Sequence, residues 1–76
     1  MASLRKTFGE NLRVQRKKQG ISQEALSFKA KVGTEYISKV EHGKINVCLD
    51  TVEKLSRALR VDAEVLLRTP PKKERD

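Results

Sequence analysis

The sequence predicts an all-α fold, a single compact domain of five short helices. Three observations carry this prediction. Apolar residues recur every three or four positions along most of the chain, which is the spacing of one helix face. No segment shows the alternation of apolar and polar residues that is typical of a strand. The connections between the periodic segments are short, so successive helices must turn back on one another around one core.

The first helix is expected to follow Ser3, whose side chain can cap the free N–H groups of a helix N-terminus. Phe8 and Leu12 lie one turn apart and define the inner face of this helix. Gly20 is expected to end it, because glycine readily adopts the left-handed conformation that often follows a helix C-terminus.

Two further helices follow with little chain between them. Ser22 caps the second helix, which runs from position 23 to about position 30. The third helix starts at Gly33 or Thr34, and Gly43 ends it. Only three residues separate Ala30 from Thr34, which is the size of a helix-turn-helix connection.

The fourth and fifth helices complete the domain. Four leucine and valine residues at helical spacing define the fourth helix: Leu49, Val52, Leu55 and Leu59. Asp62 caps a short fifth helix, "AEVLLR", and the chain closes with "TPPKKERD". This last segment has two prolines followed by charges and almost nothing to bury. We therefore expect one domain over residues 1–68 and a polar, disordered tail over residues 69–76.

Composition narrows the choice of partner and compartment. The formal net charge of +7 favours a polyanionic partner, although solvated helix surface would give the same count. The single cysteine excludes an intrachain disulfide, and one His with one Cys falls short of the four ligands of a usual metal site. No apolar run approaches the roughly 20 residues of a membrane span, and no secretory leader is visible. A cytoplasmic protein with no cofactor, metal, membrane or small-molecule ligand is expected.

Two segments resemble one known family. "SQEALSFKAKVGTEYISKVEHGK", followed by "NVCLDTVEKLSRAL", resembles the helix-turn-helix family of Cro and the phage repressors, often called XRE-like. The resemblance covers roughly Phe8 to Leu67. Within the family, "YIS.VE.G..N..L" is most similar to the controller proteins of restriction–modification systems. The resemblance implies a five-helix domain of the phage-repressor DNA-binding type, with the helix-turn-helix formed by helices two and three.

Four positions depart from the family pattern. Lys31 stands where the turn usually has Gly, and Arg60 stands where helix four usually ends in Gly. If either backbone position needs a positive φ, a side chain there costs about 1 kcal/mol. Gln15 stands where an apolar residue is usual, and Cys48 replaces the usual Ser cap. None of the four removes a DNA-contacting group, so these departures bear on local geometry.

The outer face of the third helix is short, polar and mixed in character. Base contacts are expected from four of its residues: Thr34, Glu35, Ser38 and Lys39. Such a helix fits the major groove, with its N-terminal residues at base edges. Thr34 can bond a base edge or meet a thymine methyl, Glu35 can accept from a cytosine amino group, and Lys39 can donate to guanine. The alternative is that Glu35 and Lys39 form only an exposed i,i+4 ion pair.

Contacts to phosphates would fix the register of these base contacts. They are expected from six residues: Lys17, Ser22, Gln23, Tyr36, Lys44 and Asn46. Gln23 stands at the N-terminus of the second helix, where free N–H groups favour an anion, and the resemblance implies that its side chain bonds a phosphate. Ser22 has the alternative role of a cap alone. The resemblance also implies a structural ion pair between Arg16 and Glu41 beneath the third helix.

The C-terminal segment carries three consecutive apolar residues, Val65, Leu66 and Leu67, and Val61 precedes them. At 100° per residue the three span too wide an arc to face a single core. A domain of this size is marginally stable alone, so we expect these four residues to form the interface of a homodimer. The alternative is that Leu66 and Leu67 close the core over the first and fourth helices.

The function implied by the resemblance is sequence-specific transcriptional regulation. A homodimer would bind a pseudo-palindromic operator in double-stranded DNA and control its own operon, with RNA polymerase as a further partner. An antitoxin that represses its own operon is the alternative, but the only spare segment, "TPPKKERD", lacks apolar anchors for a toxin. An enzyme is not expected. His42 and Cys48 are the only residues that could suggest nucleophilic catalysis, and the sequence has no glycine-rich loop that could bind a phosphate.

Overall fold

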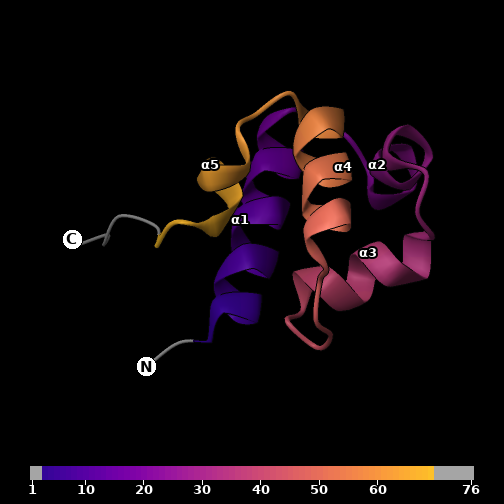
Figure 1. The fold of residues 1–76 in the computed structure, drawn as a ribbon. Coiled ribbons are helices and arrows are strands. Elements are labelled where there is room, and N and C mark those ends of the chain that lie inside the picture. Colours follow the sequence, from indigo (N-terminus) through magenta and orange to yellow (C-terminus); the bar gives the residue numbers. More distant parts are fainter. Residues whose placement is uncertain (1–2, 70–76) are drawn as a thin grey trace.

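The computed structural model describes residues 3–69 and contains five α-helices (Figure 1). These are α1 (Leu4–Lys18), α2 (Gln23–Ala30), α3 (Thr34–Glu41), α4 (Leu49–Leu59) and α5 (Ala63–Leu67). The described residues contain no strand, and the predicted all-α fold is confirmed. None of these helices is both long enough and apolar enough to cross a bilayer. The tail expected over residues 69–76 lies, beyond position 69, outside the described residues.

The helix ends follow the local signals in the sequence. The side chains of Ser3 and Ser22 each accept a hydrogen bond from the backbone N–H three residues later, at 3.2 and 3.0 Å. Both are therefore N-caps, as predicted. Gly20 and Gly43 follow the last residues of α1 and α3 with φ of +68°. Their left-handed backbone ends each helix where the sequence indicates.

The departures from the family pattern have structural consequences. Lys31 and Arg60 both have φ of +59°, so the condition for strain is met at both positions. Each side chain costs about 1 kcal/mol relative to glycine. Cys48 is the N-cap of α4, but its side chain makes no hydrogen bond to a backbone N–H; its Sγ lies 3.3 Å from Thr51 Oγ1. The α4 N-terminus therefore lacks the side-chain cap that a serine would supply.

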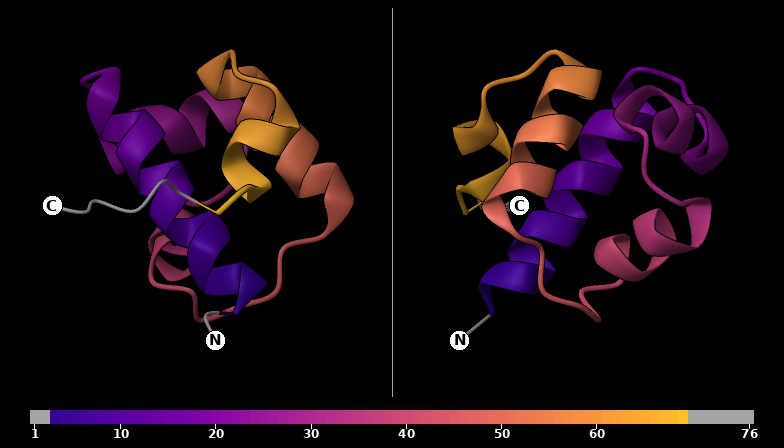
Figure 2. Two further views of the ribbon diagram at one scale, coloured as in Figure 1. Left: turned by 90° about the vertical axis from the view of Figure 1, so that its left-hand side faces the viewer. Right: turned by 45° about the vertical axis from the view of Figure 1, so that its right-hand side comes forward.

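The helices enclose one apolar core. α1 packs against α3 and α5, while α2 packs against α3 and α4. Figures 1 and 2 show α3 running across the direction of α1 and α4. Ten apolar residues are buried between the helices: Phe8, Leu12, Leu26, Ala30, Ile37, Val40, Val52, Leu55, Leu59 and Leu66. Every helix contributes to this core, so the outward face of α3 is held from behind by the whole domain.

The crossing of α1 and α3 depends on Gly9, which is buried in the middle of α1. A Cβ atom at position 9 would overlap the backbone oxygen of Val40 and lie 2.9 Å from that of Glu41. Both obstacles are backbone atoms, which cannot rotate away as a side chain would. A residue without a side chain therefore sets how closely α3 approaches α1.

Two long-range hydrogen bonds fix the C-terminal part of the domain. Asn11, buried on α1, donates from Nδ2 to the carbonyl oxygens of Leu66 at 2.9 Å and Arg68 at 2.7 Å. Gln19 donates from Nε2 to the carbonyl oxygen of Leu59 at 2.6 Å. These carbonyls lie at or just beyond the ends of α4 and α5, where no further helical N–H is available. Side chains of α1 thus satisfy the C-termini of both helices.

The position of α5 corrects one prediction. The expectation that Leu66 contacts a second copy of the chain is wrong, because Leu66 has no exposed surface and lies in the core. For this residue the alternative, that it closes the core, is the correct one. Val61, Val65 and Leu67 are half-buried, and their place in an interface stays a prediction.

Candidate nucleic-acid interface

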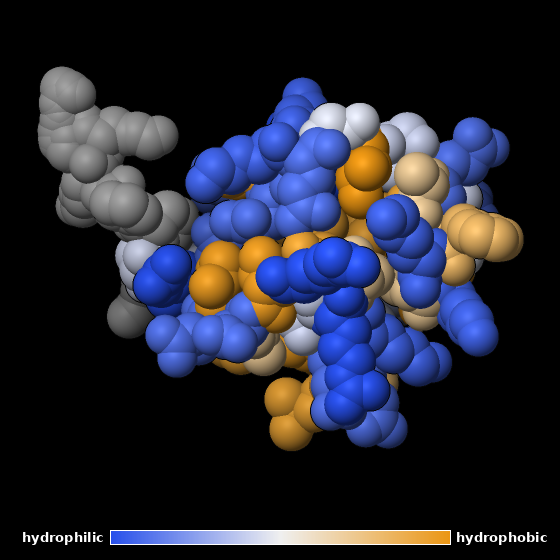
Figure 3. All heavy atoms as spheres, turned by 90° about the horizontal axis from the view of Figure 1, so that it is seen from above, coloured by the Kyte–Doolittle hydropathy of each residue, from blue (hydrophilic) through white to orange (hydrophobic). Residues whose placement is uncertain are grey.

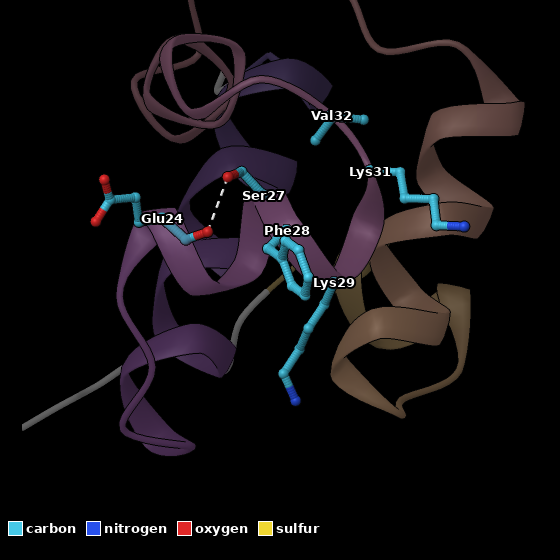
Figure 4. Close-up of a pocket in the computed structure, with 6 residues that line it drawn as sticks. All are labelled: Glu24, Ser27, Phe28, Lys29, Lys31 and Val32. Atoms are coloured by element: carbon cyan, nitrogen blue, oxygen red, sulfur yellow. Dashed lines mark hydrogen bonds between the residues drawn. The ribbon is translucent and has the colours of Figure 1, made fainter.

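The corner between α2 and α3 is fixed by a small buried serine. Ser27 lies where the two helices meet, and its Oγ donates to the carbonyl oxygen of Glu24 at 2.8 Å (Figure 4). The same Oγ lies 2.9 Å from Oγ1 of Thr34, the first residue of α3. The backbone N–H of Val32 bonds the Ser27 carbonyl oxygen at 3.1 Å. These bonds tie the start of α3 to the middle of α2.

The predicted base-contact residues share the outward face of α3. Thr34, Glu35 and Lys39 are exposed and Ser38 is half-buried, whereas Ile37 and Val40 are buried. This separation is the amphipathic pattern that the sequence predicts.

Glu35 and Lys39 do not pair with each other. The two ion pairs of residues 3–69 are Arg16–Glu41 and Arg57–Glu53. The alternative that Glu35 and Lys39 serve only as an i,i+4 pair is therefore wrong for this structure, and both charges face solvent.

The ion pair predicted beneath α3 is present, and both of its side chains are largely shielded from solvent. Arg16 Nε lies 2.6 Å from Glu41 Oε2 and Nη2 lies 3.2 Å from Oε1, which is the two-pronged geometry of strong pairs. The Glu41 side chain is only 3% exposed. Arg16 also donates to the Ile21 carbonyl oxygen at 2.9 Å, and Gln23 Nε2 donates to Glu41 Oε1 at 3.1 Å. One carboxylate therefore joins α1, the N-terminus of α2 and α3.

A hollow of about 230 Å³ opens beside this pair. Its lining comes from α1, α2 and the end of α3: Arg13, Arg16, Lys17, Gln23, Glu41 and His42. It brings together Lys17 and Gln23, two of the predicted phosphate contacts. Arg16 balances the charge of Glu41, so the excess charge at the rim is positive and suits an anion.

Arg13 and His42 are residues of this hollow that sequence reasoning missed. Arg13 stands one turn before Lys17 on the first helix, and that i,i+4 spacing was the available signal. His42 Nδ1 lies 2.8 Å from the Ser38 carbonyl oxygen. Because a carbonyl oxygen can only accept, Nδ1 carries a proton, and Nε2 is the ring nitrogen left for other contacts.

The other predicted phosphate contacts lie apart from this hollow. Ser22 is exposed and its hydroxyl oxygen is the cap of α2. Tyr36 is half-buried and packs against the core, while Lys44 and Asn46 are exposed beyond the end of α3. Asn46 lines a separate, mainly apolar hollow of about 250 Å³. The candidate phosphate contacts therefore fall into one group around the N-terminus of α2 and one after α3, with Tyr36 between them on α3.

Four large apolar side chains of the described residues are exposed: Leu4, Val14, Phe28 and Leu49. Leu4 is 62% exposed and Leu49 79% exposed, and both line the 250 Å³ hollow together with Leu67. In a view from above, apolar side chains gather on the side where α5 lies, among polar ones (Figure 3). Phe28 is 85% exposed on α2 and lies in a different hollow, between Glu24 and Lys31 (Figure 4).

Cys48 has a perturbed but isolated thiol. A hydrogen bond with the Thr51 hydroxyl lowers the pKa of the exposed Cys48 thiol below its usual value. Among residues 3–69, no three His, Cys, Asp or Glu side chains gather closely enough to hold a metal ion.

The chain is similar to several known proteins. A family model described as helix-turn-helix (HTH_3) matches residues 12–66. Control protein C.BamHI of Bacillus amyloliquefaciens is 41% identical over 66 residues, which cover 86% of this chain and 82% of that protein. The restriction-modification controller protein C.AhdI of Aeromonas hydrophila is 37% identical with a TM-score of 0.80, over 82% of this chain and 94% of that one. The hypothetical transcription factor NHTF of Neisseria is 37% identical with a TM-score of 0.86, over 90% and 78%.

Proposed function

The chain belongs to the XRE-like helix-turn-helix family, and on this basis we propose that it is a sequence-specific transcriptional regulator. As the controller of a restriction–modification system, it regulates its own operon. The observation that carries the proposal is the outward face of α3, which is polar and bears the unpaired charges of Glu35 and Lys39, on an α2–α3 corner tied by Ser27. Members of this fold class insert the second helix of the motif into the major groove. The family and the relatives are regulators of transcription, which agrees with the prediction that the chain is not an enzyme.

The DNA contacts divide into base readers and phosphate contacts. The proposed base readers are Thr34, Glu35, Ser38 and Lys39. The proposed phosphate contacts are Lys17, Ser22, Gln23, Tyr36, Lys44 and Asn46, joined by Arg13 and His42. The positive hollow before α2 supports the first group of phosphate contacts, because one anionic oxygen there meets several cations and the N-terminus of a helix. Arg16 and Glu41, which also line this hollow, act as a structural pair.

We propose further that the protein binds as a homodimer on a pseudo-palindromic operator. Val61, Val65 and Leu67 are half-buried, and Leu49 beside Leu67 is largely exposed, so an apolar surface is available to a second copy. A two-fold interface is self-complementary and would turn both α3 helices toward one side of the duplex. The half-sites would then lie about 34–36 Å apart, one turn of DNA.

Titration with operator and scrambled duplexes at several salt concentrations tests the DNA contacts. Affinity should fall with salt, with a logarithmic slope of about −0.9 for each phosphate that the protein neutralises. Lys44→Ala should weaken binding to both duplexes alike, whereas Lys39→Ala or Glu35→Ala should change which bases are preferred. If Lys39→Ala lowers both affinities equally, its assignment to base readout fails.

Sedimentation tests the dimer separately. The wild type should sediment as a dimer at tens of micromolar, and Val65→Asp with Leu67→Asp should give a folded monomer. Phe28→Asp is the control for an added carboxylate, because it places one Asp on an exposed apolar residue of another surface. A wild type that stays monomeric, or a folded double variant that still dimerises, contradicts this interface.

The operon and the transcriptional outcome complete the proposal. Neighbouring genes for a restriction enzyme and a methyltransferase would support a controller, and a neighbouring toxin gene would support the antitoxin alternative. The similarity to control protein C.BamHI favours the controller. Transcription in vitro from the operator, with and without the protein, tests whether it represses or activates through RNA polymerase. The proposed DNA-binding unit is residues 1–68, with residues 69–76 as a tail.

A further inference from the structure

The two contacts of Ser27 fix the direction of a short hydrogen-bond chain. A serine hydroxyl has one proton, and the carbonyl oxygen of Glu24, 2.8 Å away, can only accept. The Ser27 proton therefore points at Glu24. The Thr34 hydroxyl, 2.9 Å from Ser27 Oγ, must then be the donor in the second bond. The chain of bonds runs from Thr34 to Ser27 to the Glu24 carbonyl oxygen, and Figure 4 draws the bond between Ser27 and Glu24.

This direction restricts what Thr34 can offer to DNA. Its single hydroxyl proton is used inside the protein, so Oγ1 presents only lone pairs to the outside. Thr34 can therefore accept from the amino groups that adenine and cytosine expose in the major groove. Guanine exposes only acceptors at that edge, and Thr34 can donate to them only by giving up its bond to Ser27.

On the proposed function, we infer that Ser27 is a positioning residue for base recognition: it holds Thr34 as a hydrogen-bond acceptor, so that the start of α3 selects bases bearing an amino group and disfavours guanine. Glu35, the next residue, is exposed and as a carboxylate also accepts only. The first turn of α3 thus presents two adjacent acceptors. Lys39, one turn later, supplies the donor.

Ser27 acts at a distance from the bases. It is only 9% exposed, and the beginning of α3 lies against it, so it reads the operator through Thr34 alone. Ser27→Ala removes the acceptor to which Thr34 donates. The freed Thr34 hydroxyl can then rotate and donate to guanine or accept from adenine and cytosine, so discrimination at one base pair should fall while the other positions keep theirs.

Selection of binding sites from a random duplex library, followed by titration of single-base variants, tests this inference. Thr34→Val marks the base pair that Thr34 reads, because valine keeps the shape and removes the oxygen. At that pair the wild type should prefer adenine or cytosine over guanine about tenfold, and Ser27→Ala should reduce this preference to about threefold or less. Thr34→Ser, which keeps the hydroxyl, should retain it.

Ser56→Ala is the matched control. Ser56 lies on α4, away from α3. Like Ser27 it is buried, at 5% exposed, and its Oγ donates to the carbonyl oxygen three residues earlier, that of Glu53, at 3.0 Å. Its base preferences should equal those of the wild type. In the Thr34→Val background Ser27→Ala should change no preference. Urea unfolding of each variant shows that all are folded at the assay temperature.

The possible outcomes separate this inference from the proposed function. If the wild type selects no sequence at all, the proposed function fails and this inference falls with it. If it selects an operator but prefers guanine at the pair marked by Thr34→Val, or if that variant marks no pair, the inference alone is overturned. Full retention of the preference by Ser27→Ala overturns it as well.

Discussion

Replacing Gly9 by alanine tests the closest packing contact of the fold. Gly9 lies within α1, where alanine would otherwise favour the helix by about 0.5–1 kcal/mol. Against this, the new Cβ would overlap the backbone oxygen of Val40 and sit 2.9 Å from that of Glu41. Overpacking of this kind typically costs about 1–3 kcal/mol, and here α3 must move as a unit. We expect a net loss of about 1–2 kcal/mol in the free energy of unfolding, toward the upper end if the Arg16–Glu41 pair is disturbed as well.

Urea unfolding followed by circular dichroism measures this loss. With a slope of about 1 kcal/mol per molar for a small protein, the midpoint should fall by about 1–2 M. Two other glycines are controls. Gly33 has an ordinary φ of −72° and its added Cβ would meet nothing closer than 4.0 Å, so Gly33→Ala should cost only the preference of an N-cap for glycine over alanine, about 0.5–1 kcal/mol. Gly20 has open space but φ of +68°, so Gly20→Ala should cost about 1 kcal/mol through its backbone alone. A Gly9→Ala variant more stable than the wild type would refute the close crossing of α1 and α3.

Removing Arg16 or Glu41 alone should cost about 3 kcal/mol, because the survivor is a buried charge without its partner, and removing both should cost less than the sum; additive losses in urea melts would contradict this coupling. Asn11→Ala should cost about 1–3 kcal/mol and speed amide exchange in α5, since two carbonyl oxygens lose their donor; unchanged exchange there would count against the clamp. The lowered pKa of the Cys48 thiol makes more thiolate available, so alkylation by iodoacetamide should reach half its maximal rate at a pH below that of free cysteine. Thr51→Val should move that midpoint upward, and an unmoved midpoint would exclude the Thr51 hydroxyl as the cause.

The helices and their ends could be predicted because their signals are local. Caps such as Ser3 and Ser22, and stops such as Gly20, act on the backbone within a few residues of themselves. The apolar residues that form the buried face of each helix likewise recur within one or two turns of that helix. The ion pair of Arg16 and Glu41 was anticipated only through the family resemblance, since 25 positions separate the two residues.

The remaining features depend on how the helices dock. Asn11 binds carbonyls 55 and 57 positions away, and Gly9 matters only where a second helix passes over it. The bond between Ser27 and Thr34 likewise exists only once the corner is closed. Leu66 shows what the helical periodicity of one segment cannot predict. Three consecutive apolar residues must point in different directions, but which of them faces the core depends on how the helices pack.

The exposed residues of α3 differ in how they contact the rest of the domain, and this difference has an evolutionary consequence. Glu35 and Lys39 are exposed and neither takes part in the two ion pairs of residues 3–69, so exchanging them costs the fold little. Thr34 is bonded to a buried partner in the preceding helix. After duplication of such a gene, the copies can therefore diverge at positions 35 and 39, the two charged positions that we propose as base readers. Exchanging Thr34 also removes a hydrogen-bond partner of the buried Ser27 hydroxyl, so a change at position 34 costs the fold more than one at position 35 or 39.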